Sequence, residues 1–152
     1  MTGPTWQVRL LRAYWRASRG MTLGVRVAAF DAQGRICLVR HTYTTGLHFP
    51  GGGVERDQTL LDAAVDEFTD ETGFDVEPAD LTLIGVYLNR AFRGDHVALF
   101  RTDRVRPRGG PNPREIADVV WAEPGALPEG VTRATRARIA ELTAGAPPSP
   151  YW

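Results

Sequence analysis

Three acidic residues near the middle of the chain have the types and the spacing of a metal-binding site. Glu67, Asp70 and Glu71 stand at positions i, i+3 and i+4, so an α-helix would bring their side chains together on one face. Carboxylate oxygens are the ligands that Mg²⁺ prefers. A solvated acidic face is the alternative interpretation, but this stretch also carries Asp62 and Asp66 and has no lysine or arginine to pair with them. The pattern therefore favours a divalent-metal site.

Local signals predict the helix that would carry these acids. Thr59 and Asp62 have the spacing of a capping box, and Gly73 is a typical stop. Apolar residues recur between them at helical spacing and predict a buried stripe on a different face from the acids: Leu60, Leu61, Ala64, Val65 and Phe68.

A glycine-rich turn, Phe49-Pro50-Gly51-Gly52-Gly53, stands just before this helix. Because glycine has no Cβ, Gly51, Gly52 and Gly53 would let the backbone approach a ligand closely. His48 precedes the turn, and together with His41 and Tyr43 it could line a base or sugar pocket, with a surface position as the alternative.

The segment from Gly52 to Phe74 resembles the signature of Nudix hydrolases, G-x5-E-x7-R-E-U-x-E-E-x-G-U, in which U is a bulky apolar residue. The residues that match after the first glycine are Glu67, Phe68, Glu71, Gly73 and Phe74, and Asp70 replaces a glutamate. Two positions depart from the signature, because its first glutamate is Gln58 and its arginine is Asp66. The signature is recognisable but degenerate.

The resemblance implies a metal-dependent pyrophosphohydrolase, in which water attacks a phosphorus atom of a nucleoside diphosphate linked to another moiety. Glu67, Asp70 and Glu71 would be the catalytic residues and would hold one or more Mg²⁺ or Mn²⁺ ions. Glu71 is the first candidate for the general base, and Asp95 and Glu115 are alternatives.

Arg40 is a candidate phosphate clamp at the end of a predicted strand, and His48, Gly51, Gly52 and Gly53 complete the expected substrate-binding set. An exposed strand-end arginine is the alternative for Arg40. The resemblance implies a nucleotide-type small-molecule substrate, but downstream cues for particular Nudix substrates are missing.

Gln58 and Asp66 support a rival from another class, a catalytically weakened Nudix-fold module that binds or senses nucleotides. A non-hydrolytic enzyme on the same fold, such as a diphosphate isomerase, would need an acid–base pair that the sequence does not reveal.

Alternating apolar residues predict strands at 22–30, 35–40, 81–89, 96–102 and 116–123, with the first two paired as an antiparallel hairpin. Thr132 is expected to cap a final helix that runs to Thr143. The predicted class is α+β, a three-layer α/β/α sandwich with a mixed β-sheet, as in the Nudix fold.

The sequence predicts three segments: an N-terminal amphipathic basic segment (1–20), a Nudix hydrolase domain (21–144) and a flexible tail (145–152). The first segment has arginines at 9, 12, 16 and 19 beside apolar residues. We expect it to form a helix docked on the domain or on a second copy in a homodimer, with attachment to an anionic membrane surface as the alternative.

Composition fits a cytoplasmic protein, with 43% hydrophobic and 24% charged residues and a formal net charge of zero. A dedicated nucleic-acid partner is not expected without a basic excess, and no apolar run predicts a membrane span.

Overall fold

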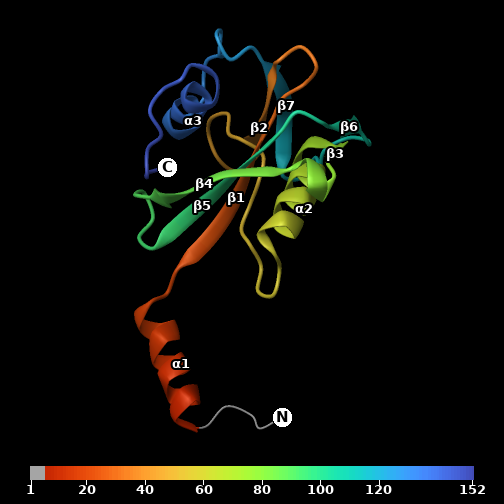
Figure 1. Ribbon diagram of the computed structural model, residues 1–152. Helices are drawn as coiled ribbons and strands as arrows, with labels where there is room; N and C mark the ends of the chain where they lie inside the picture. Colours follow the sequence, from red (N-terminus) through yellow and green to blue (C-terminus); the bar gives the residue numbers. More distant parts are fainter. Residues whose placement is uncertain (1–5) are drawn as a thin grey trace.

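The computed structural model describes residues 6–152 (Figure 1). Three α-helices are present in this range, with one short 3₁₀ helix, η1 (Pro78–Asp80). The α-helices are α1 (Trp6–Ser18), α2 (Leu60–Thr72) and α3 (Arg133–Thr143). The strands are β1 (Thr22–Ala29), β2 (Ile36–His41), β3 (Phe74–Asp75), β4 (Thr82–Asn89), β5 (Asp95–Thr102), β6 (Arg106–Pro107) and β7 (Ile116–Ala122).

The strands form a mixed sheet with order β1-β5-β4 and two small antiparallel pairs, β2-β7 and β3-β6. β1 runs parallel to β5, with Val25 opposite Ala98, and β4 runs antiparallel to β5. Five of the predicted strands are therefore confirmed within one or two residues at each end.

The predicted hairpin between the first two strands is wrong. β2 pairs with β7, and only an isolated bridge between Phe30 and Ile36 joins the ends of β1 and β2. The free edge of β1 is instead taken by the glycine-rich turn, because Val25 donates to the carbonyl of Gly52 and Val27 to that of Pro50, both at 2.9 Å. This pairing fixes the turn against β1.

Helices α2 and α3 lie on opposite sides of the strands (Figure 1). Side chains alternate along β1, so Val25 and Val27 join a buried cluster with Phe68 of α2, whereas Ala28 joins a second cluster with Ile139 of α3. The α+β fold with a mixed sheet between helices is confirmed.

Helix α2 begins and ends as predicted. The hydroxyl of Thr59 accepts a hydrogen bond from the backbone N–H of Asp62 at 3.1 Å, and Gly73 closes the helix at φ +73°. Its buried face differs from the prediction, because Leu61 is 39% exposed and Glu71 is only 5% exposed. Glu71 tolerates burial because two polar groups satisfy its carboxylate, as described below.

The segment 145–152, expected to be flexible, lies against β4. Leu88 donates to the carbonyl of Pro150 at 2.9 Å and accepts from the N–H of Trp152 at 3.0 Å. The Trp152 ring packs against Phe49 and Tyr87, with centroid distances of 6.3 and 5.7 Å. Aromatic burial and strand-like bonds therefore hold the segment despite its prolines.

Helix α1 projects away from the strands in Figure 1. Trp6, Leu10 and Tyr14 are each more than 60% exposed, so no docking of this helix on the domain is seen among the described residues. Residues 1–5 of the predicted N-terminal segment, and the side chains of Arg9, Arg12 and Arg16, lie outside the described part of the chain. Within residues 6–152, every helix is too short or too polar to cross a bilayer.

Candidate active site

A cavity of about 500 Å³ lies where the glycine-rich turn meets β1, α2 and β5. Four carboxylates and one arginine among the described residues line it, and we call it the acidic cavity: Glu67, Glu71, Asp95, Glu115 and Arg26. Gly51, Gly52 and Gly53 form part of its wall, as the sequence predicts for residues that approach a ligand. Carboxylates from α2 and from two later segments therefore face one space.

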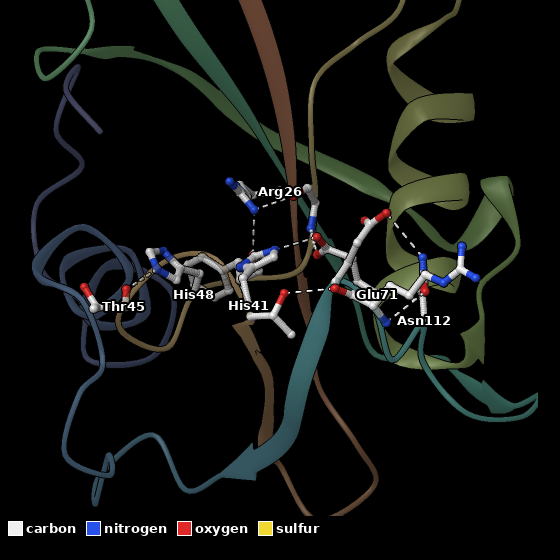
Figure 2. Close-up of polar contacts among 11 residues, drawn as sticks. Arg26, His41, Thr45, His48, Glu71 and Asn112 are labelled. Atoms are coloured by element: carbon white, nitrogen blue, oxygen red, sulfur yellow. Dashed lines mark hydrogen bonds and ion pairs between the residues drawn. The ribbon is translucent and has the colours of Figure 1, made fainter.

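Glu71 is held in place by two hydrogen bonds (Figure 2). One carboxylate oxygen lies 2.6 Å from Nε2 of His41, and the other accepts the backbone N–H of Gly51 at 2.7 Å. Both side chains of the Glu71–His41 pair are nearly buried. His41 thus links β2 to α2, and Gly51 links the glycine-rich turn to the same carboxylate.

Glu67 lies directly against Gly52. A Cβ atom added at Gly52 would come within 2.3 Å of a Glu67 carboxylate oxygen, so glycine leaves the space that this carboxylate fills. Burial raises the pKa of Glu67, and the negative charges of Glu71, Asp70 and Glu115 raise it further, against the opposing effect of Arg26. Burial and the neighbouring carboxylates therefore both disfavour the charged form of Glu67.

Gly51 must be glycine for a different reason. Its φ is +143°, and an added Cβ would lie 2.1 Å from the carbonyl oxygen of Val25. The turn can therefore press against β1 only with glycine at this position, which places the Gly51 N–H within reach of Glu71.

Arg26 is a site residue that the sequence interpretation missed. It projects from β1 into the acidic cavity and donates to the carbonyl oxygens of Phe49, at 3.1 Å, and Gly51 (Figure 2). Burial lowers its pKa, and the charge of Glu71 partly offsets this effect. The sequence did carry one signal for Arg26. It stands between Val25 and Val27 in an alternating strand pattern, so it faces the opposite side of the strand from these two core valines.

Asp70, the third predicted metal ligand, is exposed and lines a different cavity with Arg108 and the loop 109–112. Its backbone carbonyl accepts from the N–H of Asn112 at 2.9 Å. Within residues 6–152, no three His, Cys, Asp or Glu side chains lie close enough together to form a complete metal-ligand set. The structure brings Glu67 and Glu71 to one cavity but leaves Asp70 outside it.

Two further predicted binding residues, Arg40 and His48, also lie apart from the acidic cavity. Arg40 is on β2 near Gly130 and does not line the acidic cavity. The ring of His48 is directed toward the carbonyl of Thr45, 2.9 Å away (Figure 2), and burial lowers its pKa. His48 lines a neighbouring cavity, whereas Tyr43 lines the acidic one.

The candidate general bases differ in their hydrogen bonds. Asp95 accepts from the hydroxyl of Thr22 at 2.6 Å and from the amide of Asn89 at 2.8 Å. One oxygen of Glu115 accepts from Asn112 at 3.3 Å. Both carboxylates line the acidic cavity, so both stay candidates beside Glu71.

The two departures from the signature contact each other. The side-chain amide of Gln58 donates to the carboxylate of Asp66 at 3.0 Å, and its oxygen accepts the backbone N–H of Glu55 at 3.1 Å. A hydrogen bond therefore connects the loop to α2 at the positions where the signature has a glutamate and an arginine.

The donor chemistry of the acidic cavity fits a divalent cation. Glu67 and Glu71 supply hard oxygen ligands, and Glu115 lines the same space. Burial is the main reason for the raised pKa of Glu67, and the charge of Glu71 adds a repulsion that a cation would relieve. Glu71 is oriented by His41, as carboxylate ligands at metal sites commonly are.

Comparisons with known proteins show the family of the chain. The profile of the NUDIX domain matches residues 20–143. A MutT-like protein from Streptomyces ambofaciens is 32% identical over 117 residues, which cover 76% of this chain and 72% of that relative. The match to the family profile spans the whole region between α1 and the end of α3.

Solved structures share the fold. A MutT NUDIX hydrolase from Burkholderia pseudomallei aligns with a TM-score of 0.69 at 21% identity, covering 80% of this chain and 98% of that one. A MutT protein from Bacillus halodurans aligns with a TM-score of 0.64 at 16% identity, covering 80% and 82%.

The chain belongs to the NUDIX domain family. Membership supports, in general terms, a hydrolase that acts on the phosphoric anhydride of nucleoside diphosphates linked to another group. Nudix hydrolases generally use divalent metals such as Mg²⁺.

Proposed function

We propose that the chain is a Mg²⁺- or Mn²⁺-dependent pyrophosphohydrolase whose reaction takes place in the acidic cavity. The observation that carries the proposal is the meeting of Glu67, Glu71 and Glu115 in one cavity walled by the glycine-rich turn. Hydrolysis would give two phosphate-bearing products, because water attacks one phosphorus of the diphosphate.

Glu67 and Glu71 are the proposed metal-holding residues, with Glu115 as a further carboxylate of the same cavity. The sequence pattern places Asp70 with them as a metal ligand, but Asp70 lines a different cavity. Its role as a ligand therefore stays a prediction from the sequence alone. When bound, Mg²⁺ or Mn²⁺ lowers the pKa of a water molecule and neutralises charge on phosphoryl oxygens.

The chain's own groups supply orientation and charge. His41 and the Gly51 N–H hold the carboxylate of Glu71, so they fix the orientation of this cavity-lining side chain. Arg26 is the one cation that lines the cavity within the described chain, and it replaces Arg40 as our proposed phosphate-binding arginine.

Glu71, Asp95 and Glu115 are the candidates for proton transfer. Glu71 remains our first choice for the group that accepts the proton of the attacking water, since it is a buried carboxylate that two hydrogen bonds orient. Glu115→Gln provides the discriminating variant: if Glu115 is the base, this change should remove the acidic limb of the pH–rate profile.

The proposal is tested by measuring product release from a panel of nucleoside diphosphate and triphosphate derivatives with Mg²⁺ or Mn²⁺. We expect metal-dependent turnover that falls at least about 100-fold in Glu71→Gln, because this change removes a charged ligand and a candidate base. Asp62→Asn is a matched control, since Asp62 lies on the same helix but does not line the acidic cavity.

Absence of turnover on every compound, together with saturable nucleotide binding by the folded chain, would contradict the proposal. That result would favour the sensor module that Gln58 and Asp66 suggest. Equal losses in Glu71→Gln and Asp62→Asn would show that the acidic cavity has no special role.

A further inference from the structure

A second cavity of about 670 Å³ adjoins the acidic cavity. Arg26 and Phe92 line both, as do Asn89 and Trp152, so the two spaces share a wall. The second cavity lies between the turn that follows β4, the start of α3 and the segment 149–152. A ligand longer than a diphosphate could therefore occupy both.

The charges of the two cavities are opposite. The second cavity is lined by Arg26, Arg90, Arg133 and Arg138, and no aspartate or glutamate lines it within the described chain; we call it the basic cavity. With Arg26 counted in both, the lining side chains sum to a formal charge of −3 in the acidic cavity, from four carboxylates and one arginine, and of +4 in the basic cavity. Such a gradient orients a ligand whose ends carry different charge.

Arg138 provides a buried polar wall. Its side chain is 3% exposed, and it donates to the carbonyl of Tyr151 and to Glu141. Its Nε atom is buried and has no hydrogen-bond partner within the described residues. Glu141 neutralises this arginine, so the available charge of the basic cavity comes from the other three arginines.

Arg90 and Arg133 stand at the mouth of the basic cavity and are exposed. The Arg90 guanidinium lies 3.3 Å from the centroid of the Tyr151 ring, which orients it. Arg133 is the first residue of α3, where Thr132 caps the helix and the backbone N–H groups add positive potential. Both arginines can reach an anion without breaking an ion pair that the described residues make.

Base stacking is a weaker use of this cavity. Arg90 already covers one face of Tyr151, and the ring of Trp152, although it lines the cavity, is partly taken up by packing against Phe49 and Tyr87. The aromatic surface left for a nucleobase is mainly Phe92, which is 68% exposed.

We infer that the basic cavity binds an additional phosphoryl group, one that the substrate carries beyond the diphosphate held in the acidic cavity. This inference rests on the proposed function and specifies its substrate class. The favoured substrates are nucleoside diphosphate derivatives with a further phosphate ester, either on the ribose of the nucleoside or on the sugar linked to the diphosphate.

The test compares kcat/KM for matched compounds with and without that phosphate ester, at both positions. We expect the phosphorylated member of at least one pair to be preferred about tenfold or more, since hydrogen bonds to charged groups have about this value. The preference should disappear in the double variant R90Q/R133Q. It should persist in R93Q/R136Q, which removes two arginines from the same turn and helix that do not line the basic cavity.

Equal kcat/KM within both pairs would overturn the inference, as would equal losses of preference in the two double variants. Inhibition by inorganic phosphate without any preference within the pairs would also overturn it. The basic cavity would then bind free phosphate and not a phosphate ester of the substrate. Titration calorimetry on the same pairs in EDTA measures binding without metal-dependent turnover, so it tests the basic cavity separately from the proposed hydrolysis. A binding preference lost only in R90Q/R133Q supports the basic cavity even if the proposed hydrolysis fails.

Discussion

The side-chain amide of Gln58 donates a hydrogen bond to Asp66 across 3.0 Å, which connects the loop before α2 to the helix itself. These residues occupy the two positions where the family signature has a glutamate and an arginine. The sequence alone suggests that a supporting contact has been lost, whereas the structure shows a neutral–anionic hydrogen bond in its place. The connection is retained in a weaker form, since it lacks an ion pair.

Restoring the signature should therefore require both changes together. In Asp66→Arg alone, the guanidinium would face the amide group of Gln58, whose oxygen already accepts from Glu55. We expect little gain or a loss from this single variant, and a rise in kcat of about 10-fold or more from Q58E/D66R, the scale on which residues that support metal ligands act. Steady-state kinetics of the native chain and the three variants would decide; a single Asp66→Arg as active as the double variant would show that the two positions do not act as a pair.

The contact between Gly52 and Glu67 predicts that Gly52→Ala is selectively harmful to activity. The new methyl group would displace the Glu67 carboxylate, and we expect kcat/KM to fall about 10 to 100-fold as for other disturbances of metal-ligand orientation. Stability should change little, because the displaced atoms are the end of a flexible side chain. Gly53→Ala is the matched control, since nothing lies within 4 Å of its added Cβ; comparable losses in the two variants would argue against a specific role for Glu67.

Arg26 and Arg40 offer a comparison between the geometry and the sequence pattern. Arg26→Lys keeps the charge but loses the planar guanidinium, so we expect kcat/KM to fall about 10-fold or more, mainly through KM. Arg40→Lys should have little effect, because Arg40 does not line the acidic cavity. Kinetics would be accompanied by thermal melts, since Arg26 also holds the carbonyls of Phe49 and Gly51. A larger loss in Arg40→Lys would restore the assignment made from the sequence.

The raised pKa of Glu67 predicts a pH-dependent cost in the metal-free chain. The folded state holds the Glu67 proton more tightly than the unfolded state, whose value is near 4.5, so the stability contribution of this group is lost as pH rises from there through the folded pKa. Glu67→Gln should therefore raise Tm in EDTA at neutral pH and make little difference below this window. Melts over a pH series would check this; a variant destabilised equally at every pH would point to lost packing instead.

Addition of Mg²⁺ provides the complementary comparison. The native chain should gain Tm with increasing Mg²⁺, because a cation that binds only the folded state stabilises it. Glu67→Gln should lose most of that gain, whereas Asp70→Asn should keep it if Asp70 lies outside the site as the structure places it. A gain lost only in Asp70→Asn would support the metal set predicted from the sequence.

Helix α2 shows how far local signals determine structure. Its cap at Thr59 and its stop at Gly73 were predictable because each depends on neighbouring residues alone. The burial of Glu71 was not, because it depends on His41 and Gly51, which approach from β2 and the glycine-rich turn. Tertiary contacts, rather than helical periodicity, decided which acid faces the core.

The partner of β1 illustrates a second limit. A short polar turn between two apolar runs is typical of a hairpin, but the glycine-rich turn competes for the same strand edge and takes it. That pairing also brings Arg26 beside Gly51. Because the pairing cannot be deduced from sequence spacing, the spacing favoured Arg40 and missed Arg26, the arginine that lines the cavity. The family, the fold class and the glycine wall followed from the signature, but the placement of single polar groups required the strand pairing.

The central claim is that water attacks phosphorus in the acidic cavity in a metal-dependent reaction. The most direct measurement is hydrolysis of the best panel compound in ¹⁸O-labelled water with Mg²⁺, followed by mass spectrometry of both products, for the native chain and Glu71→Gln. We predict one ¹⁸O atom in a single phosphate-bearing product of the native chain, no labelled product in EDTA, and at least about 100-fold slower labelling in Glu71→Gln. Label that enters without a divalent metal, label outside a phosphate group, or an unchanged rate in Glu71→Gln would contradict the account.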